Sequence, residues 1–283
     1  MMMSVKEYDK DRFDRSKRIG WLDIDKIRNS RCLVAGAGAL GNEAVKCLVL
    51  SGFRDIVIVD MDDIVLSNLN RCVFFRSSDV KKGMKSDILA ERASELDKDV
   101  NIESIKARVQ DIEHWEDFDI IIGCLDNISA RLHVNAHSCY HGIPYIDGGT
   151  DGMRGKVQVV LPDGPCLRCA MNGSHQKLAE TRFSCTGKKG TVYIPKIAAE
   201  ITTTSVIAAM QVREAVKIAS GMERSCISDI AYYDGMSGET VVLKVKKDKN
   251  CENHTREMEE YGDTCYCEER DDRRDIEDGP GAE

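Results

Sequence analysis

The sequence predicts an α/β protein with a mainly parallel sheet and helices on both faces. The first support is the stretch Arg31–Asp60, where a strand, a glycine-rich loop, a helix and a second strand follow one another. Both strands of this unit, Cys32–Ala35 and Ile56–Val59, are continuously apolar, which is typical of parallel strands buried on both sides. Strand-like and helical segments then alternate as far as Val245. Together these observations predict a Rossmann-like fold.

The other elements are predicted in chain order from hydrophobic periodicity and from breaker residues. Residues 1–30 are polar and are expected to form an N-terminal helical segment, with Trp21, Ile24 and Ile27 among its packing anchors. Beyond the first strand–helix–strand unit we expect helices at 84–97, about 128–141 and 196–219, and strands at Asn101–Ala107, Asp119–Cys124, Pro144–Ile146, 156–161, Asp229–Asp234 and Thr240–Val245.

The composition excludes several classes of protein. The 283 residues are 42% hydrophobic, which is enough for a sizeable core, and their formal net charge of −8 argues against nucleic-acid or anionic-membrane binding. There is no apolar run of 18 residues, and the charged stretch Met1–Arg18 does not resemble a signal peptide. We therefore expect a cytoplasmic protein. Residues 268–283 hold eight acidic and three basic side chains, and we expect 255–283 to form a disordered tail.

A nucleotide site is predicted at the glycine-rich loop. Gly36-x-Gly38-x-x-Gly41 lies between a strand and a helix, and Asp60 follows nineteen residues later at the end of the next strand. Glycines permit a tight turn and close approach of the backbone, the helix N-terminus favours phosphate, and the carboxylate accepts hydrogen bonds from ribose hydroxyls. This pattern alone does not choose between NAD, FAD, S-adenosylmethionine and ATP.

Polar residues beyond Asp60 favour ATP. Asn68 and Arg71 follow it closely, and Lys85 comes fourteen residues after Arg71. Two cations and an amide suit a triphosphate, whose charge must be neutralised while a phosphate is attacked. Asp126 ends another predicted strand of the parallel sheet and is placed to hold Mg²⁺ against the phosphates. A dehydrogenase is the weaker alternative, because it would have no use for Arg71 and Lys85.

The sequence resembles the ThiF/MoeB/HesA adenylyltransferases, which are relatives of the ubiquitin-activating enzymes. The resemblance runs from about Arg12 to His254. The matching motifs are Arg12-Phe-Asp-Arg15, Gly36–Gly41, Val59-Asp60-Met-Asp62, Ser67-Asn-Leu-Asn-Arg71, Gly83-Met-Lys85, Cys124-Leu-Asp126-Asn127 and Pro165-Cys-Leu-Arg-Cys169. Two positions depart from the family pattern: Cys72 stands where a Gln usually follows the Arg, and one residue is inserted before Lys85.

The resemblance implies an adenylation domain over 31–254 that uses ATP and Mg²⁺. It implies that Asp60 binds the ribose, that Asp126 organises Mg²⁺, and that Arg15 reaches the γ-phosphate bound by the partner subunit of a homodimer. The loop around Ala39 would approach the nucleotide, and Asn68, Arg71 and Lys85 would hold phosphates. The matching motifs add further nucleotide-binding candidates, namely Gly36, Gly38, Gly41, Asp62, Ser67 and Asn127.

The implied reaction is activation of a carboxylate. The C-terminal carboxylate of a small β-grasp protein, expected to end in Gly-Gly, attacks the α-phosphate of Mg-ATP, pyrophosphate leaves, and an acyl-adenylate remains. An ionised carboxylate needs no general base, so catalysis consists mainly of positioning and charge neutralisation. The partner would be a ubiquitin-like protein or a sulfur-carrier protein. A non-enzymatic subunit, like the inactive half of heterodimeric activating enzymes, is disfavoured because the full set of charged residues is present.

Short cysteine spacings predict a zinc site. Cys166-x-x-Cys169 is one half of such a site, and Cys251-Glu-Asn-His254 fits the other half, which gives a Cys₃His set. The resembled family usually has a second Cys-x-x-Cys at the later position, so His254 is a departure. Cys265 and Cys267 are competing ligands.

Cys185 is the candidate nucleophile among the twelve cysteines. It lies in the polar stretch Thr181–Lys189, where three basic side chains would favour the thiolate. The stretch resembles the Cys-Thr segment that contains the catalytic cysteine of ubiquitin-activating enzymes. Cys185 would then receive the acyl group as a thioester and pass it to a conjugating enzyme. The alternative is transfer of the adenylate to a sulfur donor in thiamine, molybdopterin or tRNA-thiolation pathways.

Two further expectations concern the length of the chain and its histidines. About 250 residues suffice for the adenylation domain, so we expect no separate catalytic-cysteine or ubiquitin-fold domain. His133, His137 and His141 share one stripe of a predicted helix, and we expect a solvated face there rather than a metal site.

Overall fold

A computed structural model describes residues 11–171, 198–227 and 229–255 of the chain. Several expectations lie outside these residues. They are the tail that was expected to be disordered, from 256 to 283 with Cys265 and Cys267, the stretch that contains Cys185, residues 196 and 197, and the first ten residues of the N-terminal segment. Residues 198–200 are described and are not helical, so the helix expected at 196–219 begins only at Ile201.

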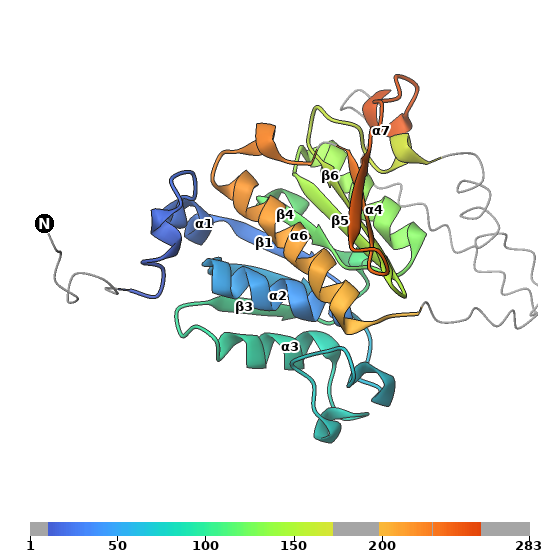
Figure 1. Cartoon of the computed structure of the whole chain (residues 1–283). Coiled ribbons are helices and arrows are strands. Elements are labelled where there is room, and N and C mark those ends of the chain that lie inside the picture. The colour runs from blue at the N-terminus through green and yellow to red at the C-terminus, as the bar shows by residue number, and fades with distance from the viewer. Residues whose placement is uncertain (1–10, 172–197, 228, 256–283) are drawn as a thin grey trace, which may run out of the picture.

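The described residues form an eight-stranded sheet of order β3-β2-β1-β4-β5-β6-β7-β8 (Figure 1). Neighbours from β3 to β5 are parallel, whereas β6, β7 and β8 pair antiparallel. The strands are β1 (Arg31–Ala35), β2 (Asp55–Val59), β3 (Asn101–Ile105), β4 (Ile120–Gly123), β5 (Tyr145–Asp151), β6 (Arg154–Val160), β7 (Ile230–Asp234) and β8 (Glu239–Leu243).

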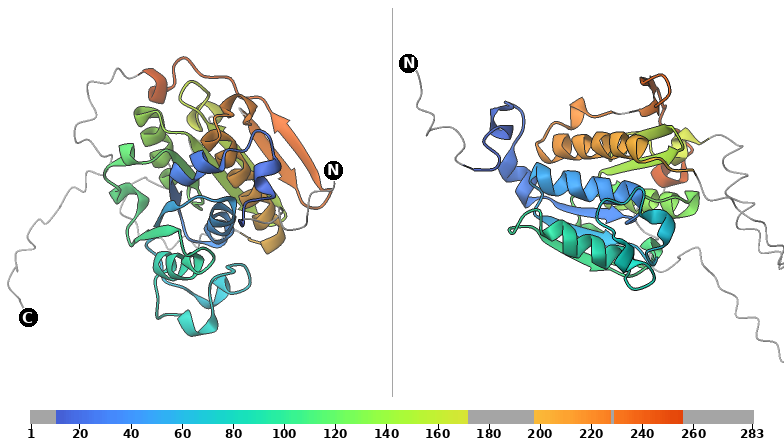
Figure 2. Two further views of the ribbon diagram at one scale, coloured as in Figure 1. Left: turned by 90° about the vertical axis from the view of Figure 1, so that its left-hand side faces the viewer. Right: turned by 60° about the horizontal axis from the view of Figure 1, so that its bottom comes forward.

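Helices cover both faces of this sheet, with α2, α3 and α6 on one face and α4 on the other (Figures 1 and 2). The α-helices are α1 (Ile24–Asn29), α2 (Ala39–Ser51), α3 (Lys85–Ser94), α4 (Ile128–His141), α6 (Ile201–Ala219) and α7 (Glu252–Thr255). Short 3₁₀ helices lie at Ser16–Arg18, Leu66–Asn68, Ser77–Asp79, Val109–Asp111, Trp115–Asp117, Arg168–Ala170 and Glu223–Ser225. None of the helices in the described ranges is both long and apolar enough to cross a membrane.

Each face of the sheet has its own hydrophobic core. Val34 of β1 packs in the core beneath α2 and α6, and its neighbour Leu33 packs in the core on the side of α4. Successive side chains of a strand point to opposite faces, so a strand covered on both sides must be apolar at every position. These layers confirm the predicted fold class.

Two local predictions differ from the structure. The N-terminal segment contains only one 3₁₀ turn and the six-residue helix α1 among residues 11–30, and Trp21, expected to be a packing anchor, is 41% exposed. Strand β5 continues to Asp151, five residues beyond the predicted end, through Gly148 and Gly149. These glycines resemble a turn in sequence. A Cβ on Gly148 would lie 2.4 Å from the Gln211 side chain, so this part of the strand packs too closely against α6 for a larger residue.

Candidate nucleotide site and metal cluster

The glycine-rich loop connects β1 to α2, and its three glycines have different surroundings. Gly36 has a φ of +103°, and a Cβ there would lie 2.5 Å from the carbonyl oxygen of Cys124. A Cβ on Gly41 would lie 2.0 Å from the carbonyl oxygen of Gly36. In contrast, a Cβ on Gly38 would have no atom of the described residues within 4 Å. Gly36 and Gly41 are therefore required for packing, whereas Gly38 faces open space at the N-terminus of α2, where an anion is favoured.

Asp60 follows β2 and holds this loop in place. Its carboxylate accepts hydrogen bonds from the backbone N–H of Ala37 at 2.7 Å and of Asp62 at 2.8 Å. Burial raises the pKa of Asp60, and the positive charge of Lys85 and the two N–H donors oppose this rise. Asp60 was predicted to bind ribose. The structure adds that the same carboxylate fixes the backbone of the glycine loop.

The predicted phosphate-binding residues lie on the segment between β2 and α3. Lys85 is the first residue of α3, and its ammonium group pairs with Asp62 at 2.6 Å. The Arg71 guanidinium donates to the carbonyl oxygen of Ser67, and the Asn68 side chain accepts a hydrogen bond from the N–H of Val65 at 2.9 Å.

The thiol of Cys72 shows that these charges are grouped. Burial raises the pKa of Cys72 to about 11, and the charges of Arg71, Lys85 and Asp60 all act on it. Arg71 and Lys85 thus both act on the neighbourhood of Cys72, and their role at a polyphosphate stays a prediction.

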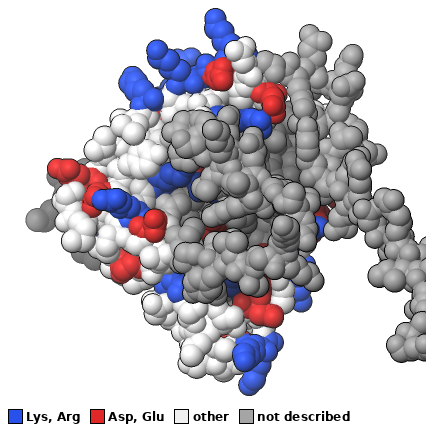
Figure 3. Space-filling view, turned by 90° about the vertical axis from the view of Figure 1, so that its right-hand side faces the viewer, with Lys and Arg blue, Asp and Glu red and all other residues white. Residues whose placement is uncertain are grey.

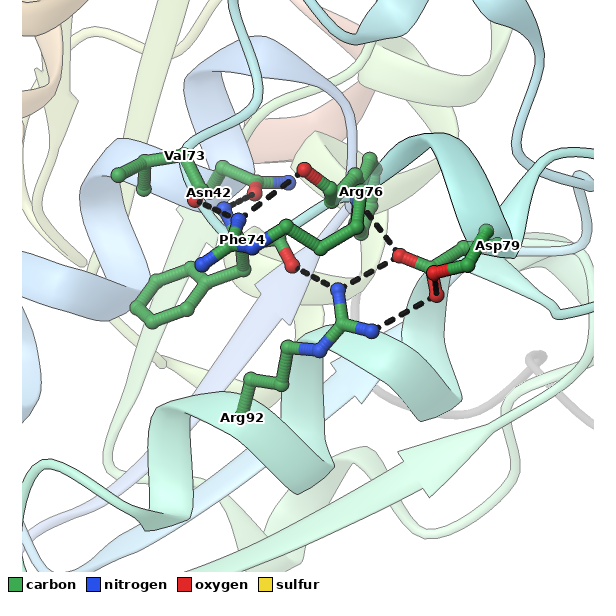
Figure 4. A network of polar contacts seen from close by, with 8 residues as sticks. Asn42, Val73, Phe74, Arg76, Asp79 and Arg92 are labelled. Carbon is green, nitrogen blue, oxygen red and sulfur yellow. Dashed lines mark hydrogen bonds and ion pairs between the residues drawn. The ribbon is translucent and has the colours of Figure 1, made fainter.

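A buried polar network attaches this segment to the glycine loop (Figure 4). The Asn42 side chain accepts from the N–H of Phe74 at 3.1 Å and donates to the carbonyl oxygens of Ala37 and Gly38 at 2.9 and 3.0 Å. The Arg92 guanidinium donates to the carbonyl oxygen of Phe74.

Arg92 is itself held by a two-bonded ion pair with Asp79, at 2.6 and 2.7 Å. The hydrogen bonds from Arg92 lower the pKa of Asp79 to about 2. Sequence reasoning missed Asn42, Asp79 and Arg92, because they belong to no motif and their partners are distant in the chain.

Asp126 and Asn127 lie at the same edge of the sheet, directly after β4. Asp126 is exposed, and Asn127 caps α4 by accepting from the N–H of Ala130 at 2.7 Å. Cys124, two residues earlier, contacts the glycine loop through Gly36. Figure 3 views the molecule from this side, and Lys, Arg, Asp and Glu side chains are visible at its outline. The structure therefore brings Asp126 to the carboxyl edge next to the glycine loop.

Arg15 lies at the opposite edge of the sheet. Its neighbour Phe13 packs against Gly52 at the end of α2, and Arg12 pairs with Asp97 between α3 and β3. The chain's own Arg15 is therefore far from its own glycine loop. Its predicted role at the site of a partner subunit stays a prediction.

Four predicted metal ligands meet on the α4 side of the sheet. The ligand atoms of Cys166, Cys169, Cys251 and His254 all lie within 4.8 Å of one another. The Cys166 sulfur is 3.8 Å from that of Cys169 and 3.6 Å from that of Cys251. Tetrahedral zinc with Zn–S bonds of about 2.3 Å requires sulfur–sulfur distances of about 3.8 Å.

The surroundings of these four residues also suit zinc. The Nε2 atom of His254 is buried and has no hydrogen-bond partner in the described residues. The N–H of Asp248 points to the Cys169 sulfur at 3.4 Å, and a hydrogen bond from Cys139 lowers the pKa of Cys166 well below that of a free thiol. Donors around thiolates and an unpaired imidazole nitrogen are expected of a Cys₃His site. The residues therefore fit a structural zinc ion.

Comparison with known proteins identifies the family. A family model described as the ThiF family matches residues 13–253. The chain belongs to the ThiF family. This family implies ATP and Mg²⁺ as cofactors, and the open glycine loop and the grouped cations described above are compatible with a bound nucleotide triphosphate.

The relatives of this ThiF-family chain include eukaryotic activating enzymes. It is 40% identical over 157 residues to the ubiquitin-activating enzyme E1-like protein of Saccharomyces cerevisiae, and 41% identical over 164 residues to the NEDD8-activating enzyme E1 catalytic subunit of Arabidopsis thaliana. The matches cover 53% and 52% of this chain but only 24% and 36% of those proteins. The chain thus spans about a quarter to a third of the length of these relatives.

Solved structures confirm the fold of this ThiF-family chain. Escherichia coli MccB with ATP matches with a TM-score of 0.72 at 19% identity, covering 89% of this chain and 77% of MccB. PaaA matches with a TM-score of 0.66 at 19% identity, covering 87% of this chain and 85% of PaaA. At these identities the likeness shows the fold alone.

The histidine stripe of α4 is packed rather than solvated. The Trp115 ring stacks on His137 with 4.6 Å between ring centroids, and His133 lies 4.6 Å from His137. Burial lowers the pKa of His137 to about 4. The expectation of a solvated face is therefore wrong for His133 and His137. Within the described ranges, the Cys₃His set is the one group of three or more residues whose ligand atoms gather closely enough for a metal.

Proposed function

We propose that this chain uses ATP to adenylate the C-terminal carboxylate of a ubiquitin-like protein that ends in Gly-Gly. The observation that supports the proposal is the chain of contacts from Lys85 through Asp62 to Asp60, whose carboxylate holds the open glycine loop, with Arg71 on the same segment. A nicotinamide cofactor would not use two cations at that place, whereas a triphosphate under attack needs them. The relatives that are named as ubiquitin- and NEDD8-activating enzymes favour a ubiquitin-like substrate.

Each group has one task in the proposed reaction. Asp60 would bind the ribose, Arg71 and Lys85 would neutralise the phosphates, and Asp126 would hold Mg²⁺. A carboxylate oxygen of the substrate forms a bond to the α-phosphorus while the bond to pyrophosphate breaks. No proton has to be moved, so positioning and charge neutralisation provide the rate enhancement. In a homodimer, Arg15 would add a positive charge at the partner's γ-phosphate.

We expect the purified chain to exchange labelled pyrophosphate into ATP when a suitable Gly-Gly-ended partner is added. The test uses ubiquitin, NEDD8, SUMO and small sulfur-carrier proteins, each as the free acid and as the C-terminal amide. Asp126→Ala should lower the exchange rate by about 100-fold or more, because Mg²⁺ loses its ligand. Asp163→Ala, at an exposed turn, is the control. If no free acid supports exchange, the chain is not an adenylating enzyme for such proteins, and a nucleotide-sensing subunit becomes the better reading.

We further propose that the acyl group passes from AMP to Cys185 as a thioester, and then to a conjugating enzyme. Cys185 lies outside the described residues, and the proposal rests on its basic sequence neighbours and on the relatives. We expect Cys185→Ala to keep pyrophosphate exchange and to lose an adduct that is sensitive to reductant. Cys226→Ala is the control. An adduct that persists in Cys185→Ala would place the nucleophile elsewhere. A thiocarboxylate product without any adduct would instead support the sulfur-carrier alternative.

A further inference from the structure

A buried ion pair lies beside the candidate nucleotide site. Arg131 of α4 donates through Nε to Asp147 of β5 at 2.7 Å, and a second guanidinium nitrogen donates to the other carboxylate oxygen. The hydroxyl group of Tyr145 also donates to this carboxylate, at 3.0 Å. The Asp147 side chain is fully buried. Arg131 is therefore the cation that contacts Asp147 directly, and the carboxylate oxygens are already occupied by three donors.

Lys156 of β6 is a second cation at this place. Lys156 pairs with Gly149 across the antiparallel strands, and directly paired residues project to the same face of a sheet. A Cβ on Gly149 would lie 3.3 Å from the Arg131 guanidinium, so Lys156 and Arg131 share that face. Lys156 is half-buried, and it forms no hydrogen bond or ion pair with the described residues. Burial and the charge of Arg131 lower the pKa of Lys156, and the charge of Asp147 opposes this only in part.

The cluster therefore holds two cations and one carboxylate in a partly buried place. An uncompensated charge in such surroundings is unfavourable, and an anionic ligand would relieve it. One unmatched positive charge suits a ligand group with a single negative charge, such as a carboxylate.

The position of Lys156 along the sheet indicates which anionic group of a bound ligand would lie near it. Asp147 pairs with Gly123 at the end of β4, and Gly149 lies two residues further along β5. Measured along the strands, Lys156 therefore lies at about the same height as the turn that contains Asp126. The phosphate candidates Arg71 and Lys85 follow β2, on the other side of Asp126 in the strand order. An anion at Lys156 would approach Mg-ATP from the side opposite to those cations.

We propose that Lys156 binds the terminal carboxylate of the ubiquitin-like substrate before this carboxylate attacks ATP. The inference rests on the proposed function. Lys156 is then the residue that selects a free C-terminus, and Arg131, paired with Asp147, positions it. Adenylation removes the negative charge from the substrate's terminus, so the ion pair with Lys156 is lost when the product forms. Lys156 therefore binds the substrate with its free carboxylate more tightly than it binds the acyl-adenylate product.

The test measures preference for a free C-terminus. A hexapeptide ending in Gly-Gly, as free acid and as amide, is titrated into the full chain with a non-hydrolysable ATP analogue. We expect the wild type to bind the acid about tenfold more tightly than the amide, since a charge-assisted hydrogen bond contributes that much. Lys156→Gln should lose this preference and Lys156→Arg should keep it. Lys98→Gln, an exposed change at the opposite edge of the sheet, should bind like the wild type.

The outcomes separate this inference from the proposed function. If Lys156→Gln keeps its preference for the acid, or if the wild type has none or binds neither peptide, the role of Lys156 is contradicted. Absence of pyrophosphate exchange in the wild type contradicts the adenylation reaction instead. In an exchanging wild type, Lys156→Gln should raise the KM for the substrate about tenfold and leave the KM for ATP unchanged. Equal melting temperatures for the two Lys156 variants would show that the effect is not a loss of folding.

Discussion

Replacing Gly41 by alanine is expected to abolish nucleotide binding and to lower the free energy of unfolding by about 3 kcal/mol. The added Cβ would lie 2.0 Å from the carbonyl oxygen of Gly36. Gly36 is held in a left-handed conformation with a φ of +103°, and its N–H donates to the carbonyl oxygen of Val59 at 2.8 Å, so its carbonyl group cannot easily move away. The first turn of α2 would have to move away from the loop, and the N–H groups that face the open side of Gly38 would move with it. Calorimetric titration with ATP and urea unfolding measure the two effects.

Gly38→Ala is the matched control for this change. It alters the same loop by the same methyl group, but no described atom lies within 4 Å of the new Cβ, and the φ of −71° suits any residue. We expect Gly38→Ala to fold as the wild type does. If the phosphates approach Gly38 closely, this variant should nevertheless bind ATP more weakly. Equal stability of Gly41→Ala and Gly38→Ala would contradict the packing role assigned to Gly41.

The sheet and the nucleotide loop could be predicted because their determinants are local. A strand such as Cys32–Ala35 is apolar at every position, and the glycines, Asp60 and the cations follow within one connected stretch. Strand β5 was cut short because Gly148 and Gly149 resemble a turn. In the structure Gly148 is required by the close approach of α6, which is more than 50 residues away in sequence, and Gly149 faces Arg131 of α4.

The polar groups that position the site could not be predicted in the same way. Asn42 meets Phe74 across 32 residues, and Arg131 meets Asp147 across 16, with no motif that joins them. Asn42 and Arg131 are polar and appear in sequence as ordinary helix residues. Only the folded chain shows that they are enclosed and paired, and buried polar groups of this kind specify where neighbouring segments lie.

Asp60 and Lys85 each have a structural role in addition to the role proposed for them in binding ATP. Asp60 holds the loop through two backbone N–H groups, and Lys85 begins α3 while its ammonium group pairs with Asp62. A triphosphate would compete with Asp62 for Lys85. The Lys85 side chain is only 11% exposed, but its partner Asp62 is 59% exposed, so water weakens the ion pair and leaves the ammonium group available to a triphosphate.

Removal of a zinc ligand is expected to have the second large effect. We expect about one zinc ion per chain, and Cys166→Ser should lose it. The metal would join the loop after β6, which contains Cys166 and Cys169, to α7, which contains His254. Helix α7 is far from this loop in sequence and has only four residues. Without it, the free energy of unfolding should fall by about 3 kcal/mol or more, and the Tm by roughly 6–12 °C. Metal analysis and thermal unfolding provide the measurements, and Cys47→Ala on the opposite face of the sheet is the control.

The fourth ligand can be identified with paired variants. His254 is within reach of the three sulfurs, and its Nε2 atom has no other partner among the described residues. His254→Ala should therefore weaken zinc binding, and His254→Cys should retain zinc because Cys₄ sets are also tetrahedral. The double change of Cys265 and Cys267 to alanine should leave the zinc content unchanged. If this double variant loses zinc while His254→Ala keeps it, a tail cysteine completes the site and the assignment of His254 is wrong.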